Sequence, residues 1–302
     1  MAICEAEIAD ETAAELTTPL TPDLRLEGPS ILTRRDCANI MGVLIDRTPR
    51  DSVIAQVERF VQSGRPNQIV TINVDFLNIA HKDRSFVSLL NAAALAVPDG
   101  MPLLWVSRLV GQRLPQRITG TDLLTDCAAL AARAGYRIFL LGAAPGVAEA
   151  AGRVLETRYP GLQIAGSYAP PEGDFTAEEN ARILDLVRAA RPAMLFVALG
   201  TPKQERWIYE NLEALGVPLC IGIGGVFNFI TGRIPRAPQT MQRLGLEWLF
   251  RLLLEPRRLW RRYLVDDTRA LYRAVHYAVR RRAGHSRETP VSVTSVVSSP
   301  DA

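Results

Sequence analysis

Short runs of nearly continuous apolar residues alternate with longer amphipathic stretches from residue 39 to residue 223. The runs predict strands, and the spacing of apolar positions between them predicts helices. The predicted strands are 39–45, 68–73, 95–97, 137–142, 162–166, 194–199 and 219–223. Strands that are apolar along their whole length are typical of a parallel sheet covered on both faces. The pattern therefore predicts an α/β fold with a mostly parallel, Rossmann-like sheet and helices on both faces.

The pattern changes after Gly224, where a glycine-bounded turn and an extended linker precede a helical stretch at 239–282. Leucine, tryptophan and tyrosine interleave there with arginine, and Pro256 should divide the stretch into two helices. We therefore expect an α/β domain at 36–238 and a basic amphipathic helical appendage at 239–282. The flanking segments lack lasting periodicity, so we expect a mobile leader at 1–35 and a disordered tail at 283–302.

Positive charge is concentrated at the C-terminal end of the chain. Fourteen arginines and four acids lie between Arg233 and Arg287, which gives this segment a net charge of +10, against +3 for the whole chain. Such a segment can bind an anionic membrane surface, bind nucleic acid, or pack on the sheet with its arginines in water. Tryptophan and tyrosine favour the membrane surface. The chain shows no nucleic-acid motif, and we expect no nucleic-acid partner.

Composition argues against several other classes. The four cysteines form no CxxC pair and there are three histidines, so we expect no metal site and a reducing compartment. No basic residue precedes Arg25, which argues against a signal peptide. No uncharged apolar run reaches the roughly 18 residues of a spanning helix. A GxGxxG fingerprint is absent from the first strand and helix, which disfavours a nicotinamide enzyme.

Polar residues gather where the predicted strands end, at the sheet edge where open α/β folds bind ligands and where helix N-termini bind anions. They are Thr71, Asn73 and Asp75; Asp99 and Gly100; Gly142 to Gly146; and Gly200, Thr201, Lys203, Gln204 and Glu205. Structural explanations stand beside the chemical ones. Asp99 could cap the following helix, and Asn73 could satisfy a turn. Gln204 and Glu205 could be exposed residues of a first helical turn.

Several blocks, in order between about 38 and 265, resemble the WecG/TagA/CpsF glycosyltransferases (glycosyltransferase family 26). The blocks are Thr71-Ile-Asn73, Val97-Pro-Asp-Gly100, Arg117-Ile-Thr-Gly-Thr-Asp122, Phe139-Leu-Leu-Gly142, Gly200-Thr-Pro-Lys-Gln-Glu205, Gly222-Ile-Gly-Gly-Val-Phe227, Gly232-Arg-Ile-Pro-Arg-Ala-Pro238, Gly245-Leu-Glu-Trp248, Glu255-Pro-Arg-Arg258 and Arg262-Tyr263. One departure is Asn228, at a position where relatives often have aspartate.

The resemblance implies an inverting, metal-independent transferase without a cofactor. It would move a sugar from a UDP-sugar to a polyprenyl-diphosphate-linked saccharide, in exopolysaccharide or cell-surface polysaccharide synthesis. The donor could be UDP-N-acetylmannosamine, UDP-N-acetylmannosaminuronate or UDP-glucose. The enzyme would be cytoplasmic and peripherally attached to the inner face of the cell membrane. The alternative is a non-catalytic membrane-binding α/β module, and the sequence leaves open whether the chain forms a homo-oligomer.

The resemblance also makes 36–238 a catalytic domain and Asp99 its general base. Substrate-binding roles are expected for Thr71, Asn73, Gly100, Gly142, Gly200, Gln204, Glu205, Arg251, Arg258 and Arg261. The chemistry is consistent with these residue types. A carboxylate can remove the proton of an acceptor hydroxyl. Arginines bind phosphate through two hydrogen bonds and can stabilise a departing diphosphate.

Overall fold

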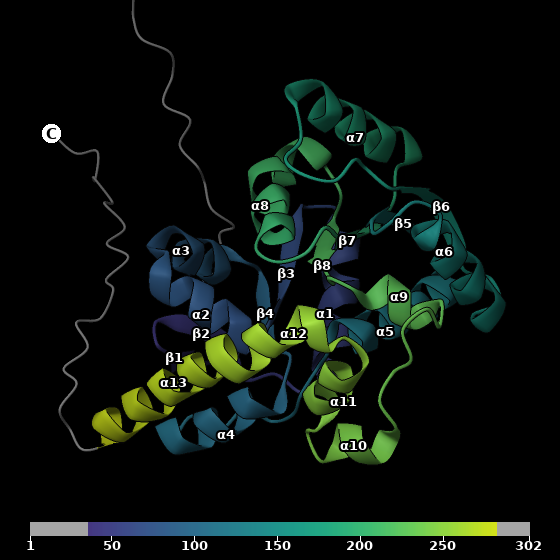
Figure 1. Cartoon of the computed structure of the whole chain (residues 1–302). Helices are drawn as coiled ribbons and strands as arrows, with labels where there is room; N and C mark the ends of the chain where they lie inside the picture. The colour runs from purple at the N-terminus through teal and green to yellow at the C-terminus, as the bar shows by residue number, and fades with distance from the viewer. Residues whose placement is uncertain (1–35, 283–302) are drawn as a thin grey trace, which may run out of the picture. The chain divides into compact units, whose positions relative to one another are not determined.

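A six-stranded parallel sheet forms the centre of the computed structural model, which describes residues 36–282 (Figure 1). The strand order is β4 (Leu95–Pro98), β3 (Asn67–Ile72), β8 (Leu219–Gly222), β7 (Met194–Ala198), β5 (Arg137–Gly142) and β6 (Gln163–Tyr168). Every pair of neighbouring strands in this sheet is parallel. The predicted α/β fold with a mostly parallel sheet is confirmed. The expectations for 1–35 and 283–302 lie outside the described residues.

Helices cover both faces because successive side chains of each strand point to opposite sides. Ile138 and Leu140 of β5 belong to one apolar cluster, while Phe139 and Leu141 belong to another. The first face is covered by α1 (Arg50–Ser63), α5 (Gly120–Ala134), α6 (Val147–Arg158) and α9 (Val226–Ile230). The second is covered by α2 (Val74–Lys82), α3 (Arg84–Ala92), α4 (Met101–Val110), α7 (Ala177–Ala190) and α8 (Lys203–Leu215).

The prediction of a single strand at 39–45 is wrong. The segment forms an antiparallel hairpin of β1 (Cys37–Ile40) and β2 (Val43–Asp46), separate from the parallel sheet. The turn consists of Met41 and Gly42, whose φ values are 56° and 91°. Two residues with positive φ match the twist of hairpin strands, and glycine adopts such a φ without strain. The Asn39 side chain secures the turn, because its Oδ1 accepts a hydrogen bond from the Gly42 N–H at 2.9 Å.

The C-terminal stretch is helical, as the pattern indicated, but it consists of five pieces and not of the two helices expected. The five pieces are α10 (Gln239–Arg243), α11 (Glu247–Leu254), α12 (Pro256–Arg261), the π-helix η1 (Arg262–Asp266) and α13 (Asp267–Arg282). The chain breaks before Pro256, which occupies the first position of α12, while the π-helix was not predicted. Among the described residues, no helix is sufficiently long and apolar to cross a membrane.

Helix α13 packs on the α/β domain through small side chains. Ala270, Ala274 and Ala278 are fully buried at a spacing of four residues, which places them on one face of the helix. This face lies against α2 and α4, and Ala274 and Ala278 belong to the apolar cluster of β3 and β4. The last helix therefore fixes the C-terminal pieces before it at the carboxyl edge of the sheet.

Candidate active site

A cavity of about 580 Å³ opens at the carboxyl ends of four strands. The loops after β3, β4, β7 and β8 form its floor, and α11, α12, η1 and the first turn of α13 line the other side. A crevice at the strand ends is where open α/β folds bind ligands, and the volume suits a small molecule.

The cavity collects eight of the eleven residues for which the sequence suggested a role. They are Thr71, Asn73, Asp99, Gly100, Gly200, Gln204, Arg251 and Arg258. The other three, Gly142, Glu205 and Arg261, do not line it. A Cβ on Gly142 would meet the carbonyl oxygen of Ala198 at 2.5 Å, so this glycine allows β5 and β7 to end close together. Arg261 is exposed to solvent.

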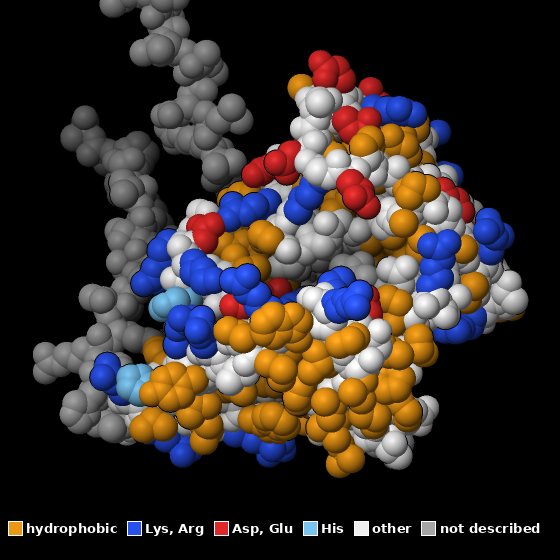
Figure 2. All heavy atoms as spheres, viewed as in Figure 1, with side chains coloured by type: hydrophobic (Ala, Val, Ile, Leu, Met, Phe, Trp, Pro, Cys, Tyr) orange, Lys and Arg blue, Asp and Glu red, His pale blue; other side chains and the backbone are white. Residues whose placement is uncertain are grey.

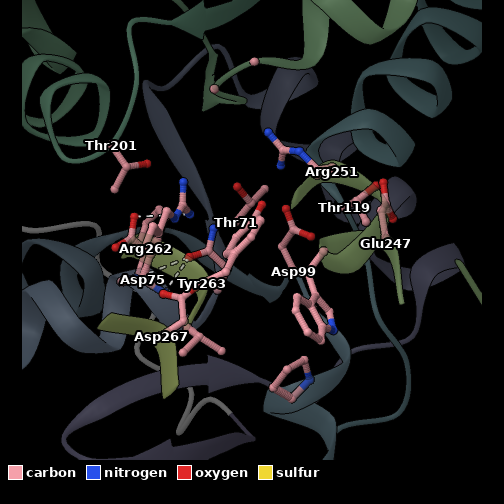
Figure 3. A pocket seen from close by; sticks show the side chains of 18 of the residues that line it. Thr71, Asp75, Asp99, Thr119, Thr201, Glu247, Arg251, Arg262, Tyr263 and Asp267 are labelled. Atoms are coloured by element: carbon pink, nitrogen blue, oxygen red, sulfur yellow. Dashed lines mark hydrogen bonds and ion pairs between the residues drawn. The ribbon is translucent and has the colours of Figure 1, made fainter. Parts of the chain in front are cut away.

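Asp99 follows β4 directly and lines the cavity, as Arg251 and Glu247 also do (Figure 3). It does not cap the following helix, because the N-cap of α4 is Gly100 and no side chain caps that end. Its carboxylate instead accepts a hydrogen bond from the backbone N–H of Gly120, the first residue of α5. The capping role that the spacing suggested is therefore replaced by a contact with a different helix.

Burial raises the pKa of Asp99 to about 7, and the negative charge of Glu247 adds to this effect. Arg117 and the Gly120 N–H act in the opposite direction because they stabilise the carboxylate. A carboxyl group with this pKa changes its protonation state near neutral pH, as a general base in the cell requires.

Four charged residues near Asp99 form a chain of ion pairs that reaches α11. They are Arg117, Asp122, Arg236 and Glu247. Glu247 Oε2 lies 3.0 Å from Arg117 Nη1, and Glu247 Oε1 lies 3.7 Å from Arg236 Nε. Arg236 Nη2 lies 3.3 Å from Asp122 Oδ1. None of the four was expected to have a role, although all four lie within the quoted blocks: Arg117 and Asp122 begin and end one block, and Arg236 and Glu247 lie in two others. Their pairing across 130 and 114 residues of sequence could not be seen from local pattern.

Gln204 joins two of the loops that form the cavity floor. Its Oε1 accepts hydrogen bonds from Gly200 N–H at 3.2 Å and Gly224 N–H at 3.0 Å. Its Nε2 donates to Glu205 Oε1 at 2.6 Å. Both side chains are buried, so they are not the exposed first-turn residues of the structural explanation. Burial raises the pKa of Glu205 to about 7, and this carboxyl group lies beneath the loop and outside the cavity.

Thr71 and Asn73 also hold local structure. The Thr71 hydroxyl donates to the Gly222 carbonyl at 3.3 Å, linking the ends of β3 and β8. Asn73 caps α2, because its Oδ1 accepts from the N–H groups of Asp75 and Phe76. The turn role considered for Asn73 is therefore present, and both residues still line the cavity.

Three arginines of the C-terminal helices line the cavity, namely Arg251, Arg258 and Arg262. Arg251 lies over the Phe229 ring at 5.1 Å from its centroid, and its buried Nε has no hydrogen-bond partner among the described residues. Arg258 Nε donates to Glu255 Oε1 at 2.8 Å. The cavity thus has positive charge on the side opposite the strand ends.

A second charged group lies on the other side of the cavity from Asp99 (Figure 3). Arg262 Nη2 in the π-helix lies 3.2 Å from Asp75 Oδ2. Burial raises the pKa of the adjacent Asp267 to about 7, while Arg262 opposes this shift. Asn228 also lines the cavity.

Comparisons with known proteins agree with the blocks found in the sequence. Residues 38–284 match the sequence model of the Glycosyl transferase WecG/TagA/CpsF family. One relative is the N-acetylglucosaminyldiphosphoundecaprenol N-acetyl-beta-D-mannosaminyltransferase of Bacillus subtilis (strain 168). It is 35% identical over 196 residues, covering 65% of this chain and 74% of the relative. A protein of the same name from Staphylococcus aureus (strain NCTC 8325 / PS 47) is 31% identical over 225 residues, covering 74% and 87%.

Proposed function

Because the chain belongs to the WecG/TagA/CpsF family of glycosyltransferases, we propose that it transfers N-acetylmannosamine from a UDP-sugar to a polyprenyl-diphosphate-linked N-acetylglucosamine. The names of both relatives specify this sugar and this class of acceptor. The observation that carries the proposal is one cavity that contains both a carboxylate poised near neutral pH and several arginines. These groups are what glycosyl transfer from a nucleoside diphosphate requires.

Asp99 is the proposed general base. The acceptor hydroxyl donates a hydrogen bond to its carboxylate and loses the proton to it as the hydroxyl oxygen attacks the anomeric carbon. The bond from that carbon to the donor phosphate breaks, and its electron pair leaves with UDP. Attack opposite the departing group inverts the anomeric centre. The pKa near 7 keeps a substantial fraction of Asp99 ionised in the cell and still leaves the carboxylate basic.

The departing diphosphate requires positive charge. Among the described residues, no group of three or more His, Cys, Asp or Glu side chains could hold a metal ion. Arg251 and Arg258 line the cavity and are the residues that we assign to the diphosphate. A guanidinium binds phosphate oxygens through two parallel hydrogen bonds, and such bonds are stronger than bonds between neutral groups. Arg258 is paired with Glu255 and Arg262 with Asp75, so Arg251 is the arginine of the three that can bind the diphosphate without breaking an ion pair seen among the described residues.

The acceptor lipid would be reached from an apolar surface. Apolar side chains gather over α4 and α10 to α13, with arginines at the edges (Figure 2). The exposed residues there include Trp105, Leu109, Leu244, Leu253, Leu254, Trp260 and Leu264. An apolar surface with basic residues around it suits the interface of an anionic membrane. We therefore propose peripheral attachment at the inner face of the cell membrane.

The proposal is tested with purified full-length protein, a synthetic polyprenyl-diphosphate N-acetylglucosamine acceptor and a panel of UDP-sugars, with product mass as the readout. We expect a mass increase of one N-acetylhexosamine with UDP-N-acetylmannosamine. Transfer from UDP-glucose or from UDP-N-acetylmannosaminuronate instead would reassign the donor. No product from any donor would contradict the transferase proposal and favour the non-catalytic alternative.

The role of Asp99 is tested by Asp99→Asn. This change keeps the shape and removes the base, so we expect kcat to fall about 10²- to 10⁴-fold, the usual contribution of general base catalysis. Calorimetry should show UDP binding within a few-fold of the unchanged protein. Wild-type turnover in this variant would exclude Asp99 as the base.

A further inference from the structure

Glu247 connects the C-terminal helices to the floor of the cavity. It lies in the first turn of α11, and its two oxygens contact two different arginines, Arg117 and Arg236. Glu247 and both arginines have side chains that are 16% to 27% exposed. Charges removed from water to this degree are screened less by salt than surface charges are.

The charges around Asp99 come from three parts of the chain. Arg117 precedes α5, Asp122 belongs to the first turn of α5, and Glu247 belongs to α11. Arg236, from the 233–238 linker, contacts Asp122 and Glu247. These five side chains comprise three carboxyl groups and two guanidinium groups, and Arg251 of α11 adds a further guanidinium that lines the same cavity. Of the three carboxyl groups, Asp99 alone has no ion pair among the described residues, so it is the one most easily protonated.

We propose, on the basis of the transfer reaction proposed above, that Glu247 is a positioning residue that holds Arg117 in place beside Asp99, so that docking of α11 prepares Asp99 for proton removal. Without the Glu247 charge, Arg117 is free to pair with Asp99 directly. Such a pair stabilises the carboxylate and makes it a weaker base. Helix α11 therefore contributes two residues to the site: Glu247, which holds Arg117, and Arg251, one of the proposed diphosphate ligands.

The first test is the pH dependence of kcat/KM in full-length Glu247→Gln. Asp99 must be ionised to act, so activity of the wild type should rise with pH through about 7. Glu247 raises the pKa of Asp99, and removing its charge should therefore move this rise to lower pH, on the order of one unit. We expect kcat on the plateau to fall about threefold to tenfold because the base is weaker. KM for the donor should change little.

Three variants separate positioning from stability. Arg117→Gln should move the rise to higher pH, since Arg117 lowers the pKa of Asp99. Glu247→Asp keeps the negative charge, so its pH profile should be closer to that of the wild type than the profile of Glu247→Gln is. Asp126→Asn removes a two-bond pair between α5 and Arg50 that lies outside the cavity. It can lower stability, but its pH profile should match that of the wild type.

A second readout requires no substrate. NMR of protein labelled with ¹³C at aspartate carboxyls follows the titration of Asp99, whose signal is identified by its loss in Asp99→Asn. A lower titration midpoint in Glu247→Gln supports the proposal even if no donor supports transfer, in which case only the proposed function fails. Unchanged midpoints in both Glu247→Gln and Arg117→Gln would overturn it.

Discussion

The pKa of Asp99 is determined by residues that are distant from it in sequence. Burial and the Glu247 charge make ionisation costly, whereas the Gly120 N–H and Arg117 make it favourable. The N-terminus of a helix stabilises a carboxylate by about 0.3–1 kcal/mol, up to about 2 kcal/mol in partly buried sites. Because the pKa is still raised to about 7, the cost of burial outweighs this stabilisation. The raised pKa of Asp99 therefore depends on where the residue is held, and the acid-then-glycine pattern around it would not predict this pKa.

Arg251 is expected to contribute directly to the binding of UDP. It has no ion pair among the described residues and lines the cavity, so its guanidinium is available to a phosphate. We expect Arg251→Gln to weaken UDP binding about 10- to 100-fold, the loss of about 1.5–3 kcal/mol for hydrogen bonds to a charged group. Arg251→Lys should recover only part of this loss, because an ammonium group does not form the paired bonds.

Calorimetric titration with UDP measures the effect without a lipid acceptor. Arg257→Gln is the matched control, because Arg257 is an exposed arginine of the neighbouring helix that does not line the cavity. Equal UDP affinity in Arg251→Gln and Arg257→Gln would show that Arg251 does not bind the diphosphate.

At the scale of elements, the loops after β7 and β8 depend on one another. The Gln204 side chain bridges them, and it occupies the space beside Gly222. A Cβ at residue 222 would lie 2.8 Å from Gln204 Nε2 and 2.9 Å from Glu205 Oε1. These atoms are buried and cannot move without breaking the bridge. The glycine is therefore required by close packing.

We expect Gly222→Ala to lower the free energy of unfolding by about 1–3 kcal/mol, as overpacking does in a filled interior. Urea denaturation measures this change. Gly152→Ala in α6 is the control, because its Cβ would make contacts of 3.4 Å or more and alanine favours the helix. A Gly222→Ala protein as stable as the wild type would show that the two buried side chains can rearrange.

The sequence predicted most elements because apolar periodicity is local. It correctly placed the strands of the parallel sheet and the break before Pro256. It missed the Met41–Gly42 turn because a short apolar run reads as one strand. It placed Asp99 at the cavity but suggested the wrong helix for its contact. The pairs of Glu247 depend on how α11 docks, which no local pattern encodes.

For the whole molecule, the apolar surface of α4 and α10 to α13 predicts membrane binding. Leu253 and Trp260 are 71% and 52% exposed. Replacing both with aspartate removes apolar area and adds repulsion from an anionic surface. We expect this variant to stay in the supernatant when wild-type protein sediments with vesicles that contain anionic lipid. It should keep its affinity for UDP.

The control is Leu186→Asp, which changes an exposed leucine of α7, a helix that packs on β6 and α8. This variant should sediment like the wild type. The basic residues predict that raising the salt concentration weakens sedimentation of the wild type, since screening acts on exposed charges. If the Leu253 and Trp260 variant sediments fully, the surface has another role.

The π-helix at 262–266 determines how the preceding helix α12 is rotated about the helix axis relative to α13. A π-turn is closed by hydrogen bonds between residues i and i+5, so it contains more residues than an α-turn. The three alanines of α13 fix the phase of the helix that follows, so removing one residue would rotate the preceding turns by about 100°. Arg262 would then turn away from Asp75, and Leu259 would leave its buried position. The number of residues in this segment is accordingly constrained more strictly than their identity. Deletion of a single codon would disturb the cavity more than most substitutions in the same turn.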